Sequence, residues 1–253
     1  MAFLDRDGVN IFFQHDGSGP PVLLSNGFSS TTRMWRGQID AFKDRYSILT
    51  WDMRGHGQSD SPEDPAAYSE ALTVDDMAAI LDHCGFERAV IGGLSLGGYM
   101  SMAFAATYPE RVAGLMLFDT GPGYKNDKTR EDWNISALRQ AKEFEKKGLD
   151  ALGKSEEMQL GGHKSASGLA LAARGMLAQK NARVINSLPQ IAVPTLVLAG
   201  AKDKPFLAGT DYMARKIPDA RKVIIPDAGH AANIHQPAAF NEAMDEFLTR
   251  IYG

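Results

Sequence analysis

Short apolar runs rich in β-branched and aromatic residues alternate along the chain with stretches whose apolar residues recur at helical spacing. Gly, Pro, Asn, Asp or Ser bounds most of the apolar runs, which is typical of strands that end in turns. The predicted strands are Val9–His15, Val22–Ser25, Ser47–Asp52, Val90–Leu94, Val112–Phe118, Thr195–Ala199 and Lys222–Ile225. Residues 16–21, Asp-Gly-Ser-Gly-Pro-Pro, predict a hairpin-like turn between the first two strands.

Helical spacing is clearest in three places outside the middle of the chain. Thr73–Cys84 has one apolar face, with Thr73 as the expected N-cap and Gly85 as the stop. Leu96–Tyr108 is apolar and is ended by Pro109, and Phe240–Ile251 has apolar residues at core-facing spacing. Strands that alternate with helices favour the α/β class, with a mostly parallel, doubly wound sheet covered on both faces.

The pattern changes between Gly121 and Pro189. Helical spacing dominates there, over Trp133–Lys147, Leu169–Leu177 and Val184–Leu188, and strand patterns return only afterwards. We therefore predict a core made of residues 1–120 and 190–253, with a helical cap inserted at 121–189.

Composition narrows the class of protein. The 253 residues carry a net charge of −4 with no basic block, which argues against nucleic acid or an anionic membrane as a partner. The start of the chain has no apolar leader, and no run of about 20 apolar residues occurs. A single cysteine cannot form an internal disulfide. These features predict a cytoplasmic protein that does not bind membranes.

Gly93-Leu94-Ser95-Leu96-Gly97 lies between a predicted strand and a predicted helix. This spacing is that of a nucleophile elbow, a strained turn that raises a serine hydroxyl above the edge of a sheet. Glycines two residues to either side let the strand and the helix close. The N–H of Leu96, at the start of the helix, is the expected oxyanion donor.

A serine nucleophile needs a base, and the base needs an orienting acid. In chain order the expected partners are Asp203, just after the strand Thr195–Ala199, and His230, just after the strand that ends at Ile225. Asp119 also follows a strand and is a rival for the acid. Asp203 is preferred because Asp119 stands where the chain leaves for the cap.

Other candidate residues have simpler interpretations. Asp52 begins a turn, Asp-x-Arg-Gly-His-Gly, that is expected to be structural. The histidines are scattered without metal-ligand spacing and no phosphate-binding loop occurs, so we expect neither a metal nor a cofactor. Trp35, Tyr99 and Trp133 are candidates for the substrate pocket.

The motifs together resemble the α/β-hydrolase fold superfamily over nearly the whole chain. They are Gly17-x-Gly19-Pro20, Asn26-Gly27, the Asp52 turn, Gly93–Gly98, Pro109–Val112, Pro194-Thr195, Gly200-x-x-Asp203 and Gly229-His230. Within the superfamily, Asn26, Met34-Trp35 and Ala232–Pro237 are similar to 3-oxoadipate enol-lactone hydrolases. The resemblance implies that the N–H of Phe28 is the second oxyanion donor, although many relatives have His where Asn26 stands and Glu where His235 stands.

The sequence therefore predicts a cofactor-free serine hydrolase that cleaves a small ester or lactone. Hydrolysis of a C–C bond, perhydrolysis and acyl transfer would use the same triad, and a non-enzymatic receptor with this fold is a further alternative. Neither the natural acyl substrate nor the oligomeric state follows from the sequence.

Overall fold

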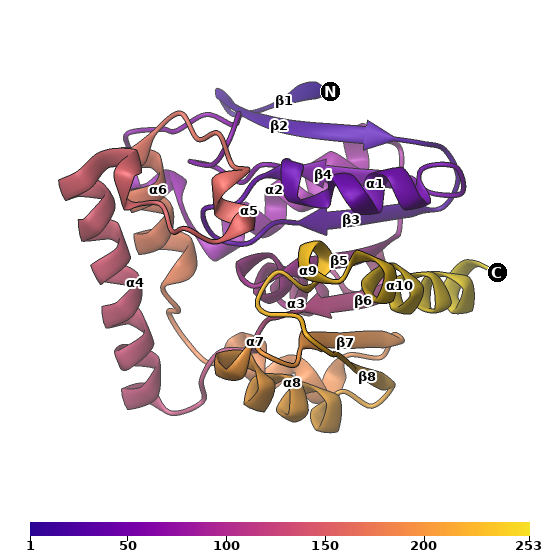
Figure 1. The fold of residues 1–253 in the computed structure, drawn as a ribbon. Helices are drawn as coiled ribbons and strands as arrows, with labels where there is room; N and C mark the ends of the chain where they lie inside the picture. The colour runs from indigo at the N-terminus through magenta and orange to yellow at the C-terminus, as the bar shows by residue number, and fades with distance from the viewer.

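A computed structural model describes residues 1–253, which form one eight-stranded sheet flanked by helices (Figure 1). The strand order is β1-β2-β4-β3-β5-β6-β7-β8. Pairing is antiparallel where β2 meets β1 and β4, and parallel everywhere else. The strands are β1 (Ala2–Arg6), β2 (Val9–Asp16), β3 (Pro21–Ser25), β4 (Ser47–Trp51), β5 (Ala89–Leu94), β6 (Val112–Phe118), β7 (Thr195–Gly200) and β8 (Ala220–Ile225). The α/β class and the mostly parallel sheet are confirmed.

Ten α-helices connect or flank these strands: α1 (Arg36–Phe42), α2 (Glu70–His83), α3 (Leu96–Thr107), α4 (Asp127–Lys147), α5 (Glu156–Gln159), α6 (Ala166–Ala172), α7 (Arg183–Ser187), α8 (Lys204–Lys216), α9 (Ala232–His235) and α10 (Pro237–Tyr252). Short 3₁₀ turns occupy Thr32–Trp35, Pro65–Ala67, Pro109–Arg111, Gly148–Ala151 and Leu188–Gln190, and one π-helical turn spans Ala173–Leu177. No helix has the length and apolar character needed to cross a bilayer.

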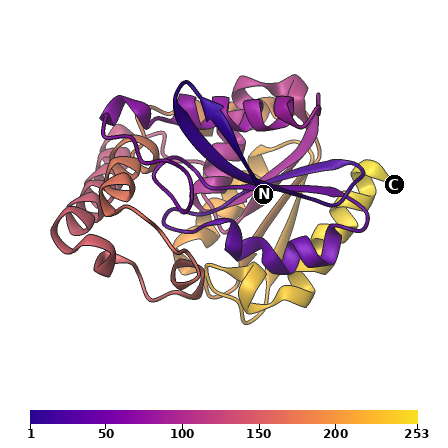
Figure 2. The same cartoon turned by 90° about the horizontal axis from the view of Figure 1, so that it is seen from above.

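The sheet is covered on both faces, as Figure 2 shows from above. Successive residues of a strand point to opposite faces. In β3, Leu23 packs in the core cluster that also contains residues of α2, α3 and α8, whereas Leu24 packs in the cluster of α1 and α10. Both clusters are buried, which explains why these central strands are apolar without a polar face.

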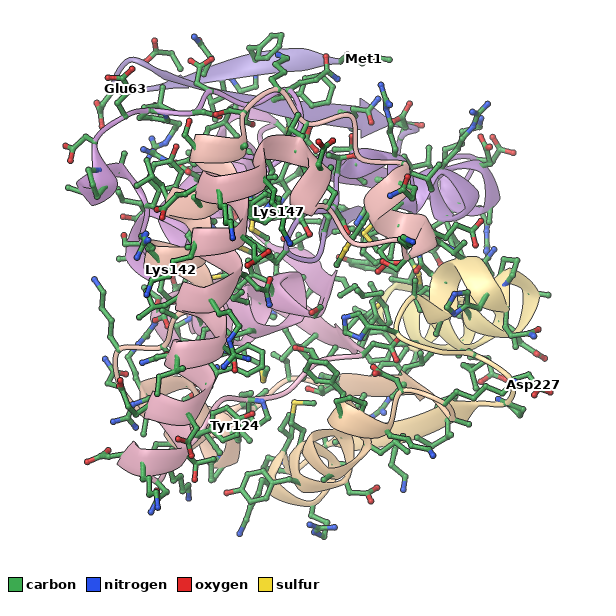
Figure 3. All side chains as sticks on the ribbon, turned by 60° about the vertical axis from the view of Figure 1, so that its left-hand side comes forward. Met1, Glu63, Tyr124, Lys142, Lys147 and Asp227 are labelled. Carbon is green, nitrogen blue, oxygen red and sulfur yellow. The ribbon has the colours of Figure 1, made fainter.

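Between β6 and β7 the chain forms only helices, and α4 is the longest of them. Ala137, Ala141 and Phe144 are buried at spacings of four and three residues, and they face the rest of the protein. Lys142 and Lys147, labelled in Figure 3, are exposed on α4. The division into a core of residues 1–120 and 190–253 and a cap of residues 121–189 stays a prediction.

Two local predictions are wrong. Residues 16–21 do not join a hairpin, because β3 pairs in parallel with β4 and β5 and not with β2. Thr73 is not an N-cap: α2 begins three residues earlier, where the Ser69 hydroxyl accepts from the N–H of Leu72. Five strands or α-helices were also missed, namely β1, α1, α5, α8 and α9. All but α8 have seven residues or fewer, which is too short to show a clear period.

Candidate active site

Ser95 lies at the turn between β5 and α3 with φ 55° and ψ −115°, a conformation that L residues seldom adopt. Its N–H donates to the carbonyl of Phe118 at 3.0 Å, and its own carbonyl accepts from the Thr120 hydroxyl at 2.6 Å. The turn is also tightly packed against β3. A Cβ on Gly97 would stand 2.1 Å from the carbonyl oxygen of Ser25. The glycine is therefore required for α3 to pack against β3 and hold the turn.

Two backbone N–H groups beside this turn have no acceptor in the protein. Leu96 is the first residue of α3, where N–H groups lack an intrahelical partner. The N–H of Phe28, after β3, likewise donates to no carbonyl or side chain of the protein. A Cβ placed on Gly27 would lie 3.5 Å from Cβ of Ser95, so the loop of Phe28 passes close to the serine.

Asn26 fixes the conformation of that loop. Its Nδ2 donates to the carbonyl of Ser30 at 2.7 Å, across a turn closed by the N–H of Ser30 and the carbonyl of Gly27. Ser29, inside this turn, has φ 55°. The side chain of Asn26 is fully buried, so it acts as an internal brace. The amide side chain of Asn26 thus holds this loop in place.

A histidine from the cap region is bonded to the same loop. His163 Nδ1 accepts from the N–H of Gly57 at 3.0 Å, so the proton is on Nε2, which donates to the carbonyl of Ser29 at 2.9 Å. Burial lowers the pKa of His163. Asp52 braces the adjoining turn by accepting from the N–H groups of Thr32 and Gln58. The structural role expected for the Asp52 turn fits these bonds.

His230 and Asp203 lie in the loops after β8 and β7 and are in direct contact. Nδ1 of His230 is 2.8 Å from Oδ2 of Asp203, and since a carboxylate can only accept, the imidazole donates. Asp203 occupies the N-cap position of α8 but makes no capping bond, because its side chain is turned to the histidine. The ring of Phe206 stacks on His230 with centroids 4.9 Å apart.

The environment of His230 affects its charge in two opposing ways. Burial by itself lowers the pKa of the imidazole, since it penalises the charged form. The hydrogen bond and negative charge of Asp203, together with the charges of Asp119 and Glu157, act in the opposite direction, and the net pKa of His230 is raised. A basic imidazole held in one orientation is the form suited to take a proton from a hydroxyl.

Asp119, the rival acid, makes different bonds. Its Oδ1 accepts from the N–H of Gly200 at 2.7 Å and its Oδ2 from the N–H of Ala232 at 3.4 Å. No hydrogen bond joins it to His230. Burial, followed by the nearby charge of Asp203, raises the pKa of Asp119 to about 8. Asp119 therefore connects the ends of β6 and β7 to the start of α9.

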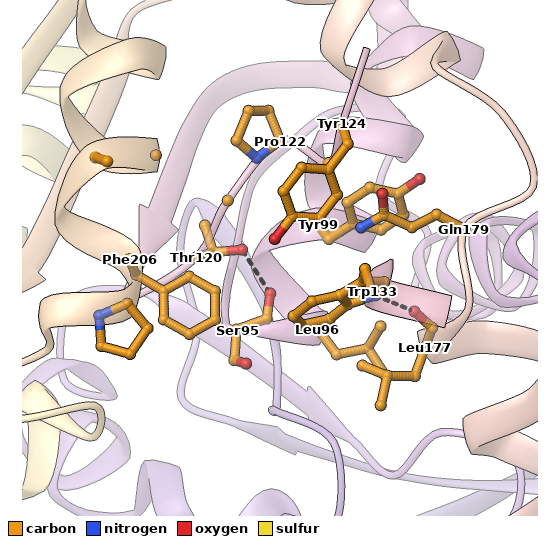
Figure 4. Close-up of a pocket in the computed structure, with 15 residues that line it drawn as sticks. Ser95, Leu96, Tyr99, Thr120, Pro122, Tyr124, Trp133, Leu177, Gln179 and Phe206 are labelled. Carbon is orange, nitrogen blue, oxygen red and sulfur yellow. Dashed lines mark hydrogen bonds between the residues drawn. The ribbon is translucent and has the colours of Figure 1, made fainter. Parts of the chain in front are cut away.

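Two hollows meet at Ser95. The first, which we call the aromatic pocket, has a volume of about 280 Å³ (Figure 4). It is lined by Ser95, Leu96, Tyr99, Thr120, Gly121, Pro122, Gly123, Tyr124, Trp133, Leu177, Gln179, Pro205, Phe206, Ala208 and Gly209. In the view of Figure 4, the rings of Phe206 and Trp133 lie on either side of Ser95. The indole N–H of Trp133 donates to the carbonyl of Leu177 at 2.9 Å, so this ring is held in place.

The second hollow, which we call the acidic pocket, has a volume of about 210 Å³. It is lined by Gly27, Phe28, Ser30, Leu94, Ser95, Trp133, Gln140, Glu157, Met158, Leu177, Phe206 and His230. Ser95 and His230 thus line one hollow, with the loop of Phe28 on its wall. The hydroxyl of Ser95 makes no hydrogen bond within the protein and is free to meet a ligand.

Most of the residues predicted for the site come together here. The acidic pocket is lined by Ser95, His230 and Phe28. The aromatic pocket is lined by Leu96, Tyr99 and Trp133. Asp203 is hydrogen-bonded to His230.

The prediction that Trp35 belongs to the substrate pocket is wrong. Trp35 is fully buried under the opposite face of the sheet, where its ring packs against Phe118 and Phe240, because α1 covers that face. It cannot contact a ligand in either pocket.

Several residues at the site were not predicted: Thr120, Gln140, Glu157, Gln179 and Phe206. Thr120 follows a predicted strand, and that position was a usable signal. Glu157, in the four-residue helix α5, and Gln179, outside any helix or strand, lie between β6 and β7 where no periodic pattern indicates which side chains face inward. No group of three or more His, Cys, Asp or Glu side chains could hold a metal ion.

Comparison with known proteins identifies the family to which this chain belongs. A sequence model of a family described as the alpha/beta hydrolase fold matches residues 20–161, more than half of the chain. 3-oxoadipate enol-lactonase 2 of Acinetobacter baylyi is 27% identical, over 91% of this chain and 89% of its own.

Two solved structures are similar to this chain over nearly its whole length. An esterase from Thermogutta terrifontis, described as thermophilic and malate-bound, has a TM-score of 0.83 and 31% identity over 99% of this chain and 97% of its own. The enol-lactonase from Burkholderia xenovorans LB400 has a TM-score of 0.80 and 25% identity over 98% of this chain and 100% of its own. The expected similarity to enol-lactone hydrolases is confirmed.

Proposed function

The chain belongs to the alpha/beta hydrolase fold family and is a hydrolase, and on this premise we propose that it cleaves a carboxylic ester or lactone through an acyl-enzyme on Ser95. The observation that carries the proposal is the convergence around Ser95, where the two hollows meet, of a strained backbone turn, a histidine paired with a carboxylate, and two N–H groups without acceptors. Such a set is what acyl transfer from an ester to water requires. The esterase and enol-lactonase relatives support the same class of substrate.

In the proposed reaction, Ser95 Oγ attacks the carbonyl carbon while Nε2 of His230 takes the hydroxyl proton. Asp203 holds the proton on Nδ1, so that Nε2 is the free base, and stabilises the imidazolium that forms. The carbonyl oxygen becomes negatively charged and accepts from the N–H groups of Phe28 and Leu96. The Ser95–His230 hydrogen bond would form with substrate in place, since such bonds are often long in free enzymes.

Breakdown of the tetrahedral intermediate breaks the bond between the carbonyl carbon and the alcohol oxygen. His230 gives its proton to that oxygen, and the acyl group stays on Ser95. Water then attacks the acyl carbonyl, with His230 again as the base, and releases the acid and the free serine. Each step uses side chains and backbone groups of this chain alone.

A receptor that shares the fold would bind a ligand without turning it over. A fluorophosphonate probe and p-nitrophenyl acetate separate the two functions. We expect stoichiometric labelling of Ser95 together with steady hydrolysis of the ester. Labelling without any turnover would favour the receptor, and a panel of esters, lactones and diketones would distinguish ester from C–C bond hydrolysis.

The pH dependence of kcat/KM should report His230. The imidazole must be neutral to act as base, so activity falls as the pH drops through its pKa. The pKa of an unperturbed histidine is about 6.5. Because Asp203 raises the pKa of His230, the acid limb should lie above that value. The control is Asp203→Asn, which removes the hydrogen bond to a carboxylate and its charge, so the limb should move to lower pH. A flat profile from about pH 5 to 8 would contradict the role of His230.

A further inference from the structure

The acidic pocket contains a buried carboxylate that neither the fold nor the proposed reaction uses. Glu157, in α5, is only 3% exposed. The hydroxyl of Ser155 donates to its Oε1 at 2.6 Å, and no lysine, arginine or histidine forms a salt bridge with it. Buried carboxylates are normally paired with a cation. An unpaired one that faces a hollow suggests that the ligand supplies the partner.

The remaining walls of this pocket fit a cation. Neither pocket is lined by any lysine or arginine. The rings of Phe28, Trp133 and Phe206 line the acidic pocket beside Glu157. Aromatic faces attract cations through their quadrupole, and aromatic rings with a carboxylate are a typical site for an ammonium group. The negative charge of Glu157 and the aromatic lining of the pocket therefore both favour a bound cation.

The proposed chemistry decides which part of the substrate lies here. His230 must deliver its proton to the departing alcohol oxygen, so the alcohol leaves on the side of His230. That side is the acidic pocket, because His230 does not line the aromatic pocket. The acyl group then occupies the aromatic pocket, and Glu157 faces the alcohol. Burial lowers the pKa of His230 and Asp203 raises it, and the charge of Glu157 raises it further. Glu157 and His230, which line the same hollow, therefore interact electrostatically.

Resting on the hydrolysis proposed above, we propose that Glu157 selects the alcohol part of the substrate by charge. The favoured esters are those whose alcohol carries an ammonium group, and esters whose alcohol carries a carboxylate are rejected. The aromatic rings add attraction for the cation, and the absence of any lysine or arginine leaves a carboxylate of the alcohol without a salt-bridge partner.

Three butyrate esters that differ in charge test this selection: butyrylcholine, its neutral analogue 3,3-dimethylbutyl butyrate, and the butyrate ester of 4-hydroxybutanoate. The variant is Glu157→Gln, which keeps an oxygen for Ser155 but removes the charge. We expect the ratio of kcat/KM for butyrylcholine to that for the neutral ester to fall by about tenfold or more, and the relative rate of the anionic ester to rise. Glu156→Gln removes the same charge from the exposed neighbouring residue, and its ratios should match the wild type.

Equal ratios in the wild type and Glu157→Gln would overturn the selection while leaving hydrolysis intact. An equal loss on all three esters would also overturn it, because Glu157 would then act through His230. If the wild type hydrolyses no ester, the proposed function fails, and calorimetric binding to Ser95→Ala still decides the selection. Tighter binding of butyrylcholine than of 3,3-dimethylbutyl butyrate supports it, and equal affinity contradicts it.

Discussion

Replacing Ser95 with alanine should lower kcat for ester hydrolysis by about 10⁶-fold, the loss found when a serine protease loses its nucleophile. The substitution removes the atom that attacks the carbonyl, and no other hydroxyl occupies the tip of the turn. The folded state should be unaffected, since Ser95 Oγ makes no hydrogen bond within the protein and the backbone bonds of the turn remain. Steady-state hydrolysis of p-nitrophenyl acetate and a thermal melt measure the two properties.

Ser136→Ala, at an exposed position of α4, serves as the matched control and should retain full activity. An alanine variant at position 95 that kept activity within about tenfold of the wild type would rule out covalent catalysis by this serine. A large drop in melting temperature would show that the hydroxyl has a structural role instead.

The second large effect is expected at Asp203. Asp203→Asn should lower kcat by about 10⁴-fold, because an amide can donate to the imidazole and favour the wrong tautomer. The 2.8 Å contact between Asp203 and His230 is the basis for this expectation. The loss is smaller than for Ser95 because the nucleophile, the base and the oxyanion donors all remain.

Asp119→Asn is the informative comparison. Burial raises the pKa of Asp119 and so favours its uncharged form, which asparagine resembles. Asparagine also tolerates the left-handed backbone of this position, φ 44°. Its side-chain oxygen can still accept from the N–H of Gly200. We expect activity within about tenfold of the wild type, far above that of Asp203→Asn. A crippled Asp119→Asn with an active Asp203→Asn would transfer the role of the acid to Asp119.

The central strands and the candidate site residues could be located from the sequence because local pattern and chemistry coincide there. The central strands are buried on both faces, so their apolar runs are continuous. Ser95 and Asp203 come soon after two of these strands, and His230 comes after the edge strand β8. The turn at Ser95 needs glycines that are visible in the sequence. Chain order is therefore enough to predict that Asp203 and His230 lie near Ser95.

The parts that could not be predicted depend on contacts distant in sequence. Trp35 belongs to a motif near the oxyanion loop, yet the direction of α1 turns its ring to the opposite face of the sheet. Glu157 lies in a four-residue helix, too short for a periodic pattern, and only tertiary packing brings it to the hollow that His230 also lines. Pocket walls made by the short helices between β6 and β7 are thus the least predictable feature of this chain.

The acyl-enzyme itself is the most direct test of the account. The protein is mixed with p-nitrophenyl acetate, quenched in acid within the first turnover, digested and analysed by mass spectrometry. The account predicts one acetyl group on the peptide that contains Ser95, a group that disappears as the ester is exhausted. Rapid hydrolysis of the ester with Ser95 unmodified throughout would contradict it.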